Sequence, residues 1–335
     1  MKKIIAIIAG GDSSEHDVSM RSAAGISSWL DRDKFEVFII EVRGTVWHAH
    51  LHSGKLAPVD LHHFTFLDEW NRKITPDFAY ITIHGTPGEN GILQGYFDLI
   101  NIPYSTSGVL VEALTFNKFA LNQFLKGFGV RVAEDILVRK GQEIPVEEVV
   151  EKIGLPCFIK PNAGGSSFGV TKVKTADQIL PAIAKAREES DEVLIESMME
   201  GVEITDGVYK TKNGGGQVFP VTEVVPKTEF FDYDAKYNGA VEEITPARIS
   251  EDTTKRVQTL TSAIYDVLGA SGIIRVDYIL TKNESGDDVI NMLEINTTPG
   301  MTPTSFIPQQ VRAAGLEMKD VLSEIIEDKL NMVNC

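Results

Sequence analysis

The stretch Arg275–Ser305, RVDYILTKNESGDDVINMLEINTTPGMTPTS, decides how this chain is interpreted. Two apolar, β-branched runs flank the polar segment TKNESGDD, which predicts two strands joined by a hairpin connection. Arg275 and Asp277 are two residues apart, as are Glu294 and Asn296, so each pair lies on one face of its strand. If the strands pair, a cation, two carboxylates and a carboxamide converge beside a loop of Gly, Pro and Thr.

These converging groups predict a site for phosphate and metal. Carboxylate and amide oxygens are hard ligands that suit Mg²⁺ carrying phosphate oxygens, and an arginine suits a developing negative charge. An ordinary strand pair with a surface salt bridge is the alternative. Four polar groups on the inner face of apolar strands argue against that alternative, because uncompensated buried charge is costly.

Length and charge limit the class of protein. A chain of 335 residues is suited to two or three compact domains, and 43% hydrophobic with 24% charged residues is typical of a soluble globular protein. A formal net charge of −16 argues against nucleic acid as a partner. If the substrate is anionic, lysines and arginines must be concentrated at the site itself.

Cysteine use and hydropathy predict the compartment. The two cysteines, Cys157 and Cys335, form neither a disulfide framework nor a zinc pattern, so a reducing compartment fits best. The N-terminal apolar run is too short for a signal peptide, and no apolar stretch approaches a membrane span. We expect a cytoplasmic protein that binds neither membrane nor nucleic acid.

The pattern of elements predicts an α/β fold. Ile4–Ala9 is an apolar run typical of a buried parallel strand, with a helix expected over His16–Leu30 and a second strand over Phe35–Val42. One helix is expected over Leu114–Gly129 and another over Glu251–Leu268, the latter with Ser250 as N-cap and Gly269 at its end. Further strands are expected over Phe78–Ile83, Cys157–Lys160, residues 171–174, Glu192–Glu196, and parts of Val202–Tyr209 and Val218–Val225, with a helix over Gly91–Ile100.

A Gly-rich segment, AGGSSFGV over Ala163–Val170, lies between two expected strands. It lacks the lysine and the following helix of a Walker A loop, but its backbone N–H groups can still bind phosphate oxygens as a flexible flap. On the loop alone, a plain hairpin is the better interpretation. Lys160, three residues before the loop, favours the phosphate interpretation by adding a cation.

Glu15, in EHDVS, follows the first strand at the sheet edge where open α/β folds bind ligands. A carboxylate there can receive a ligand ammonium group. Taken by itself, Glu15 is better explained as an acidic residue at the start of a helix, where the helix dipole favours a negative charge. The sequence GGDSS lacks the spacing of a dinucleotide fingerprint.

Two other segments are distinctive. Pro226–Arg248 is long, aromatic and charged without a sustained period, which is typical of an active-site lid, with an exposed connection as the alternative. His48, His50 and His52 alternate in WHAHLHS and would share a strand face. Zinc binding there is conceivable, but without a suitably spaced carboxylate or cysteine an exposed polar face is the better interpretation.

Taken in order, these motifs resemble a known family. GGDSSEHDVS, IHGTPGENG, TFNKFA, IKPNAGGSSFGV, FFDYDAKY, RVDYIL and LEINTTPGMTPTS are similar, over essentially the whole chain, to D-alanine–D-alanine ligases, which are ATP-grasp enzymes of peptidoglycan precursor synthesis. The resemblance implies an α/β fold, α+β in its ATP-grasp part, with domains over residues 1–107, 108–196 and 197–335. It places ATP between the central and C-terminal domains.

The resemblance also implies roles for individual residues. The metal ligands would be Asp277, Glu294 and Asn296, holding two Mg²⁺ ions or Mn²⁺ in their place. The ATP-binding residues would be Lys118, Lys160, Ser167, Glu196, Met199, Glu203 and Phe230. The substrate-binding residues would be Glu15, His84, Lys236 and Ser305, and the catalytic residues Glu15, Ser166, Tyr237, Arg275 and the Gly300 N–H. A homodimer is a further expectation, with D-alanine and ATP as small-molecule partners.

Some positions depart from the common pattern of that family. Ala163 and Gly164 replace a charged residue and a glutamate, and Met198-Met199 replaces a pair that usually contains an aromatic residue. Two alternatives remain open: a relative that joins D-alanine to D-lactate or D-serine, and a nucleotide-binding protein without ligase activity. Tyr237 favours the dipeptide, and the complete set of metal carboxylates, Arg275 and Lys236 favours an active enzyme.

Overall fold

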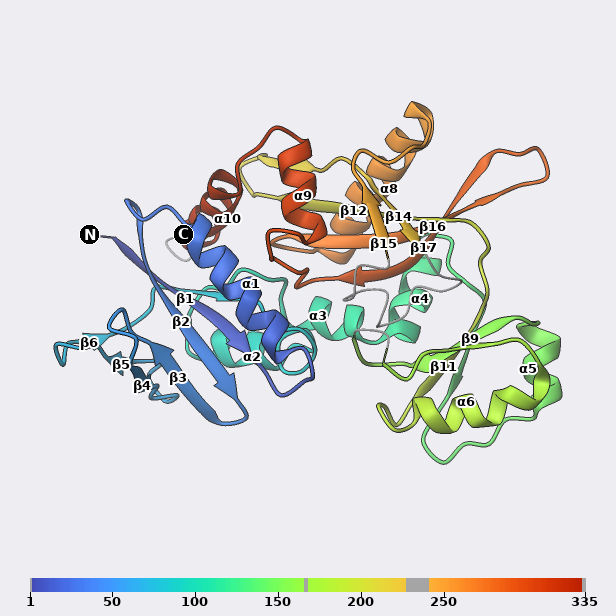
Figure 1. Cartoon of the computed structure of the whole chain (residues 1–335), viewed down its shortest axis with the longest axis horizontal. Helices are drawn as coiled ribbons and strands as arrows, with labels where there is room; N and C mark the ends of the chain where they lie inside the picture. Colours follow the sequence, from blue (N-terminus) through green and yellow to red (C-terminus); the bar gives the residue numbers. More distant parts are fainter. Residues whose placement is uncertain (1, 166–167, 227–240, 333–335) are drawn as a thin grey trace.

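Three main sheets organise the protein, one in the N-terminal third, one in the middle and one in the C-terminal part (Figure 1). The computed structural model describes residues 2–165, 168–226 and 241–332. A small two-stranded sheet of β5 (Phe66–Leu67) and β6 (Lys73–Ile74) adds to the N-terminal part.

The N-terminal sheet has the order β4-β3-β2-β1-β7. Strands β2, β1 and β7 are parallel, as the apolar run at Ile4–Ala9 predicted for β1, and β3 and β4 extend the sheet beyond β2 in antiparallel fashion. The elements are β1 (Lys3–Gly10), α1 (His16–Trp29), β2 (Phe35–Arg43), β3 (Val46–His50), β4 (Leu56–Pro58), β7 (Phe78–Ile81) and α2 (Ile92–Leu99).

The turn after β1 determines where α1 begins. Gly10 and Gly11 both have positive φ, +95° and +93°, and a Cβ on Gly10 would lie 2.7 Å from the Val42 carbonyl oxygen. Only glycine tolerates both conditions without strain. The chain can therefore turn tightly and place Glu15, the N-cap residue of α1, beyond the carboxyl end of the strand.

The central sheet has the order β10-β9-β11-β8 and is antiparallel throughout. Helices α5 and α6 pack on one face of it around a core that contains Cys157 and Ile159 (Figure 1). The elements are β8 (Asp135–Val138), α5 (Val146–Lys152), β9 (Cys157–Pro161), β10 (Thr171–Val173), η1 (Ala176–Gln178), α6 (Ile179–Ala186) and β11 (Val193–Ser197).

The single helix expected over Leu114–Gly129 is wrong. The chain forms two helices, α3 (Val109–Phe116) and α4 (Lys118–Lys126), which meet at Asn117. Asn117 has the extended conformation of an N-cap, its side chain accepts a hydrogen bond from the Ala120 N–H, and its backbone bridges to Ala163. A capping residue inside an apolar pattern thus starts a new helix, which brings Lys118 to a helix N-terminus.

The C-terminal sheet has the order β15-β14-β12-β16-β17, with β13 paired to β12. The predicted hairpin is confirmed, because β16 and β17 pair in antiparallel fashion from Lys282↔Asp288 to Arg275↔Asn296. The elements are β12 (Val202–Lys210), β13 (Gly216–Val218), β14 (Thr222–Pro226), β15 (Val241–Ile244), α8 (Glu251–Leu268), β16 (Ile274–Lys282), β17 (Asp288–Asn296), α9 (Phe306–Ala313) and α10 (Met318–Met332).

Part of Val218–Val225 forms a strand, as predicted: Val218 ends β13, and β14 begins at Thr222. Pro220 lies between them and has no N–H to donate to a ladder. Helix α8, by contrast, has the predicted bounds and caps: the Ser250 hydroxyl accepts a hydrogen bond from the Thr253 N–H, and Gly269 has the left-handed conformation. Its apolar side packs on the sheet in a core that includes Val257 and Ile264.

The last two helices return to the N-terminal part of the protein. One apolar core contains Ile5 and Ile7 of β1 together with Ile307 of α9 and Ile326 of α10, so the end of the chain packs against its beginning. In the part of the chain that the structure describes, no helix combines the length and apolar character needed to cross a bilayer. The domain boundaries at residues 107 and 196 stay predictions.

Candidate functional site

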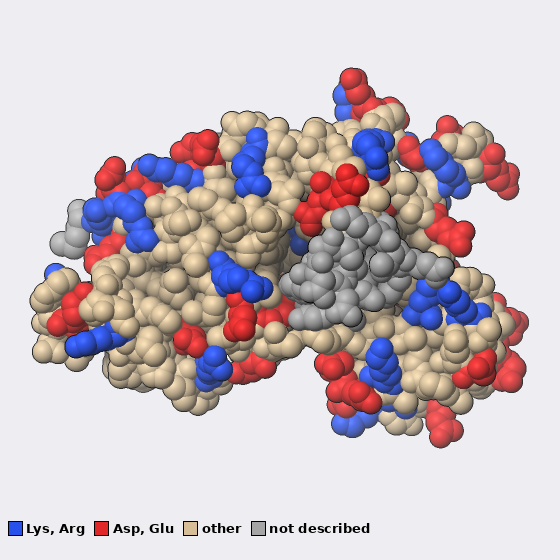
Figure 2. Space-filling model, viewed as in Figure 1, with Lys and Arg blue, Asp and Glu red and all other residues tan. Residues whose placement is uncertain are grey.

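A cleft with a volume of about 1410 Å³ is lined by α1 and a loop of the N-terminal part, together with strands of the central and C-terminal sheets. Its walls include Glu15 from the N-terminal part, Lys160 and Glu196 from the central part, and Arg275 and Glu294 from the C-terminal sheet. Acidic and basic side chains are interspersed over the face of the protein in Figure 2. A local concentration of cations must therefore be sought inside the cleft.

On the C-terminal wall, Asp277 lies at the centre of a hydrogen-bonded group. Arg275 donates from Nε to Oδ1 and from Nη2 to Oδ2, both at 2.8 Å. Thr205 on the neighbouring strand donates to Oδ1 at 2.5 Å, and Asn296 Nδ2 donates to Oδ2 at 3.2 Å. The two-residue spacing predicted the shared face, and the register places Glu294 directly opposite Asp277.

This group has the oxygen donors of a Mg²⁺ site. The Asn296 amide gives its N–H to Asp277, which leaves its carbonyl oxygen for another partner, and Glu294 adds a carboxylate beside it. Two carboxylates and an amide oxygen match the hard-ligand preference of Mg²⁺. Among the described residues there is no group of three or more His, Cys, Asp and Glu side chains that could hold a metal by themselves. The site therefore depends on Asn296 and on oxygens brought by the ligand.

Arg275 is held as a permanent cation. Burial would by itself lower its pKa, but the charges and hydrogen bonds of Asp277, with Glu294 and Glu203 further away, raise the pKa above its ordinary value. The guanidinium also lies 5.1 Å from the ring centroid of Phe306. An arginine packed between a carboxylate and an aromatic ring is pre-organised to receive negative charge.

On the central wall, Lys160 and Glu196 form a buried ion pair. Their side chains are 10% and 7% exposed, and Lys160 Nζ lies 2.5 Å from Glu196 Oε2. Asn122 of α4 donates to the other oxygen of Glu196 at 3.2 Å. Both residues line the cleft, and a lysine held in this way presents a fixed positive charge to an anionic ligand.

Lys118 lies at the N-terminus of α4 and reaches the Gly-rich segment, where its Nζ donates to the Gly164 carbonyl at 2.8 Å. Burial lowers the pKa of Lys118, and Glu294 opposes that shift while Lys160 adds to it. Two lysines thus converge on one part of the cleft. Ser166 and Ser167 of the same segment lie outside the described residues.

The Gly-rich segment and Glu15 lie in contact. A Cβ placed on Gly165 would be 2.9 Å from Glu15 Oε2, so a side chain there would crowd the carboxylate. The segment therefore approaches the N-terminal part of the molecule as well as the lysines. Sequence spacing alone could not reveal this approach, because Glu15 and Gly165 are far apart in the chain.

His84 and Glu89, both from the HGTPGENG motif, lie near Glu15 on the N-terminal wall. His84 is 8% exposed, and its Nε2 is buried with no hydrogen-bond partner in the described part of the chain. Burial raises the pKa of Glu89, partly opposed by His84 and by the Gly85 N–H, which donates to it at 2.7 Å. A buried nitrogen without a partner is suited to bind a ligand.

Ser305 and Gly300 lie together at the start of α9. Ser305 is the N-cap residue, and its hydroxyl accepts a hydrogen bond from the Thr302 N–H at 3.1 Å. A Cβ on Gly300 would lie 2.9 Å from Ser305 Oγ. The N-terminus of α9 thus opens into the cleft, where helix N–H groups favour an anion.

The part of the cleft predicted to hold a nucleoside is lined by Met199 and Glu203, with the apolar side chains of Phe158 and Ile279. Phe230 lies outside the described residues, as do Lys236 and Tyr237 and with them the predicted lid. The lid hypothesis stays a prediction.

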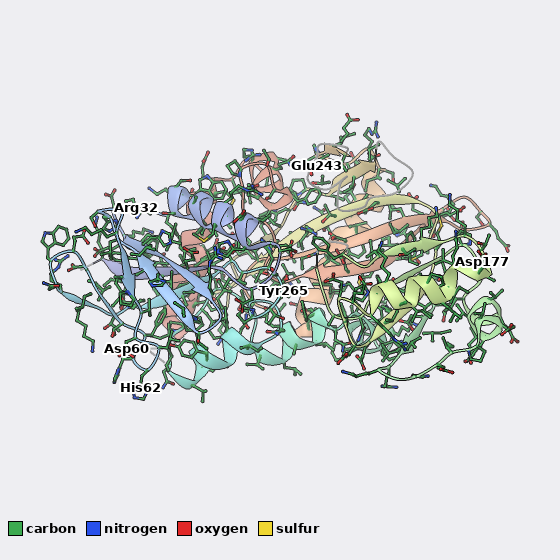
Figure 3. The ribbon with its side chains drawn as sticks, turned by 60° about the horizontal axis from the view of Figure 1, so that its bottom comes forward. Arg32, Asp60, His62, Asp177, Glu243 and Tyr265 are labelled. Carbon is green, nitrogen blue, oxygen red and sulfur yellow. The ribbon has the colours of Figure 1, made fainter. Side chains whose placement is uncertain are left out.

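Sequence reasoning missed Thr205, Glu89 and Glu243. Thr205 precedes Asp206 in an ordinary strand, and only pairing with β16 brings it to Asp277. Glu243 lines the cleft and accepts a hydrogen bond from Gln309 of α9. Figure 3 shows Glu243 on the opposite side of the molecule from His62. Glu89 belongs to the HGTPGENG motif, but the resemblance of that motif predicted a role only for His84.

The histidines at the edge of the N-terminal sheet form no such site. Figure 3 shows Asp60 and His62 at that edge, where the His62 N–H donates to Asp60 at 2.9 Å. His50 pairs with Glu41 at 3.0 Å, and His48 lies beside it on the same face of β3. These contacts agree with a polar strand face, and the prediction assigned these histidines no role.

Comparisons with known proteins agree with the geometry. Family models described as the D-ala D-ala ligase N-terminus and C-terminus match residues 4–107 and 124–327. A curated D-alanine–D-alanine ligase from Phocaeicola vulgatus is 64% identical over 329 residues, which are 98% of this chain and 100% of that protein.

Solved structures give the same family. VanG D-Ala:D-Ser ligase from Enterococcus faecalis has a TM-score of 0.84 and 32% identity, covering 98% of this chain and 99% of that one. D-alanine–D-alanine ligase from Bacillus anthracis complexed with ATP has a TM-score of 0.78 and 27% identity, covering 99% of each chain.

Proposed function

This chain belongs to the D-alanine–D-alanine ligase family, and from that premise we propose that its cleft joins two D-alanines at the expense of ATP. The product, D-alanyl-D-alanine, enters peptidoglycan precursor synthesis. One observation supports the assignment most: two lysines on one wall of the cleft face an arginine and its carboxylate and amide partners on the other. The predicted fold class, α/β with an α+β ATP-grasp part, is that of the structural relatives.

In the first half of the reaction, the carboxylate of the first D-alanine attacks the γ-phosphorus of ATP, giving an acyl phosphate and ADP. A carboxylate is a poor acyl donor, and this step converts it into an activated one. We assign Lys118 and Lys160 to the phosphates, because both are cations held by defined partners, the Gly164 carbonyl and Glu196. Fixed cations stabilise charge on a transferring phosphoryl group without reorganisation.

The oxygen donors Asp277, Glu294 and Asn296 would hold Mg²⁺, for which we propose two ions, with Mn²⁺ as a substitute. When bound, the metal would offset charge on the phosphates and orient them. Asp277 already accepts hydrogen bonds from Arg275, Thr205 and Asn296. Binding metal would therefore require Asp277 to exchange at least one of these bonds.

In the second half, the free amine of the second D-alanine attacks the acyl carbon and phosphate leaves. Arg275 and the Gly300 N–H would stabilise the tetrahedral oxyanion. Ser305, at the N-terminus of α9, would bind the carboxylate of the second D-alanine. Lys236 would share that role, as the family resemblance implies.

For the first D-alanine we propose Glu15 as the group that receives its ammonium, with His84 close by. The contact of Gly165 with the Glu15 carboxylate supports a role for the Gly-rich segment in covering this end of the cleft. The resemblance adds Ser166 and Tyr237 as residues linked to Glu15. For ATP it adds Ser167 at the phosphates, Glu196, Met199 and Phe230 at the base, and Glu203 at the ribose.

Three further features are part of the proposal. The domains span residues 1–107, 108–196 and 197–335, with Pro226–Arg248 as a lid. The enzyme works in the cytoplasm, where its nucleotide and amino-acid substrates are available. It forms a homodimer, and size-exclusion chromatography with light scattering tests this last expectation.

The experiment that tests the function is a phosphate-release assay with ATP, Mg²⁺ and a panel of D- and L-amino acids and D-lactate, with product masses determined. We expect release to require D-alanine and the product to be D-alanyl-D-alanine. D-alanyl-D-serine or D-alanyl-D-lactate as the main product at neutral pH would contradict the assignment of the second substrate. Absence of any D-alanine-dependent release would contradict ligase activity.

A further inference from the structure

The loop that leaves β17 is held by residues outside its own sheet. Thr297 donates from Oγ1 to Glu112 Oε2 at 2.5 Å, and Thr298 donates from Oγ1 to the Ile83 carbonyl at 3.3 Å. At its far end, the Met301 N–H donates to Ser22 Oγ of α1 at 3.2 Å. The loop therefore has anchors before and after Gly300 that belong to α1, to the segment that follows β7, and to α3.

Glu112 is the acidic member of these anchors. It is 0% exposed and lies on α3, where nothing in the proposed mechanism uses it. Its second oxygen, Oε1, accepts a hydrogen bond from the Ser107 N–H at 3.0 Å. One buried carboxyl group thus connects the loop after β17 to the segment that joins the N-terminal part of the chain to α3.

The environment of Glu112 makes this connection specific. Burial raises the pKa of Glu112 well above its ordinary value of 4.5, with Glu89 adding to the shift and the Thr297 and Ser107 hydrogen bonds opposing it. A buried carboxyl group needs partners for both oxygens, because an unsatisfied polar group in the interior is costly. Thr297 and Ser107 supply them, so the side chain has one well-defined place.

Loop geometry matters most at Gly300. Pro299 and Gly300 carry no side-chain hydrogen bonds of their own, so the direction of the Gly300 N–H depends on where Thr297, Thr298 and Met301 are held. An oxyanion donor must be placed within a fraction of an ångström, since misplacing reacting groups by 1 Å can cost about 100-fold in rate.

We propose that Glu112 is a positioning residue that sets the Gly300 N–H for the second half of the reaction by holding Thr297. This inference rests on the proposed function, in which that N–H stabilises the tetrahedral oxyanion. The alternative is that Glu112 only supports the fold. The two differ in a measurable way, because an acyl phosphate that is formed but not attacked by an amine is attacked by water.

Water attack on the phosphorus breaks the phosphorus–oxygen bond and gives D-alanine and inorganic phosphate without forming a tetrahedral oxyanion at the acyl carbon. Each wasted cycle therefore releases one phosphate without a dipeptide. A misplaced oxyanion donor slows amine attack and lengthens the lifetime of the acyl phosphate. The ratio of phosphate released to dipeptide formed thus reports the second half of the reaction, and a loss of folded protein leaves that ratio unchanged.

The test variants are Glu112→Gln and Thr297→Val. Gln keeps the size of the side chain but replaces one acceptor oxygen with an NH₂ group, so it cannot accept from both Ser107 and Thr297. Val removes the Thr297 hydroxyl and leaves Glu112 bonded to Ser107. The second variant keeps the proposal testable if the first folds poorly.

Asp206→Asn is the matched control. Asp206 is also a 0% exposed carboxyl group, but it lies on β12 in the core against α8 and does not line the cleft. The same acid-to-amide change is thus made at equal burial, away from the loop. Thermal unfolding of all variants, measured with the full chain, corrects for differences in stability.

We expect a phosphate-to-dipeptide ratio near one for the wild type and for Asp206→Asn. For Glu112→Gln and Thr297→Val we expect a ratio above one, and dipeptide turnover lower by about 10- to 100-fold. A ratio of one in both loop variants, whether or not turnover falls, would overturn the inference. If the wild type makes no dipeptide from D-alanine, the proposed function fails, which is a separate result.

Discussion

The two faces of the C-terminal sheet provide opposite surroundings for a buried acid. On the cleft face, Asp277 of β16 is 6% exposed and accepts hydrogen bonds from Arg275, Thr205 and Asn296. On the other face, Asp206 of β12 is 0% exposed, and neither of its carboxyl oxygens has a hydrogen-bond partner in the described part of the chain.

Asp277 and Asp206 differ in their hydrogen-bond partners rather than in their burial. Asp206 faces α8 near Tyr278 and Thr261, and burial raises the pKa of Asp206 well above 3.8, with Thr261 partly opposing the shift. Asp277 lies beside a permanent cation. Burial without a neighbouring cation thus raises the pKa of an acid, whereas an acid paired with an arginine beside a cleft is ready to act in chemistry. The following predictions test that difference.

The largest effect is expected at Glu294. Glu294→Gln keeps the shape of the side chain but removes the negative charge opposite Asp277. Turnover should fall by orders of magnitude while the fold persists, because electrostatic stabilisation of this kind is worth about 3–4 kcal/mol in other enzymes. Steady-state kinetics and circular dichroism measure the two quantities.

Glu284→Gln is the control for that variant. It makes the same change in an exposed residue at the turn of the same hairpin. Normal turnover is expected there. If the Glu294 variant is folded and nearly as active as the control, the cleft face of β17 has only a structural role.

The next effect concerns the buried pair on the central wall. Lys160→Met leaves Glu196 without its cation, which costs about 3–5 kcal/mol of stability when both groups are buried. Adding Glu196→Leu should recover much of the stability but none of the ATP-dependent activity. Urea unfolding and phosphate release measure the two outcomes, and recovery of activity in the double variant would show that Lys160 serves the fold alone.

A third prediction uses the pH dependence of stability at Asp206. Its raised pKa means that the folded protein holds a proton that the unfolded chain releases above about pH 4. Wild-type stability should therefore fall as pH rises above that value, by up to about 1.4 kcal/mol per pH unit from this one group, until the pKa of the folded state is passed.

Asp206→Asn cannot lose that proton, so its stability relative to the wild type should increase from about pH 5 to about pH 8. Urea unfolding at both values measures the difference. A difference that does not change with pH would show that Asp206 is ionised in the folded protein, and the contrast between the two faces would then be wrong.

The smallest effect is expected at the start of α8. Ser250→Ala removes the hydroxyl that accepts from the Thr253 N–H, which should cost about 1 kcal/mol of stability and leave turnover unchanged. Ser262→Ala, inside the same helix, is the control and should not destabilise it. Thermal unfolding distinguishes them. A fall in turnover with Ser250→Ala would show that α8 is coupled to the cleft.

Much of the site was predictable because it depends on short-range geometry. The spacing of Arg275 with Asp277 and of Glu294 with Asn296 fixes a shared face once the hairpin forms, since strand side chains alternate. The helix over Glu251–Leu268 was predictable for a similar reason, because its cap and its apolar period are local. The break between α3 and α4 at Asn117 could not be predicted in this way. The apolar pattern continues past Asn117 and favours one long helix, whereas the side chain of Asn117 caps a new one.

Contacts between distant segments could not be predicted. Thr205 reaches Asp277 only through strand pairing, and Glu112 reaches Thr297 although 185 positions separate them in the chain. Nothing near Glu112 in the sequence distinguishes it from a glutamate on an exposed helix face. Asp206 is equally undistinguished, and its burial follows from the packing of α8.

By itself, the sequence determined the parallel strand that leads to Glu15, the hairpin that carries the metal donors, and the family to which the motifs belong. These depend on residues within a few positions of one another, where backbone geometry dictates which side chains share a face. The tertiary structure alone decided which acids are paired with a cation, which have a raised pKa, and which residues hold the loop at Gly300. Those properties depend on burial and on partners from other elements, because the charge state of a carboxyl group follows its surroundings in space rather than its neighbours in the chain.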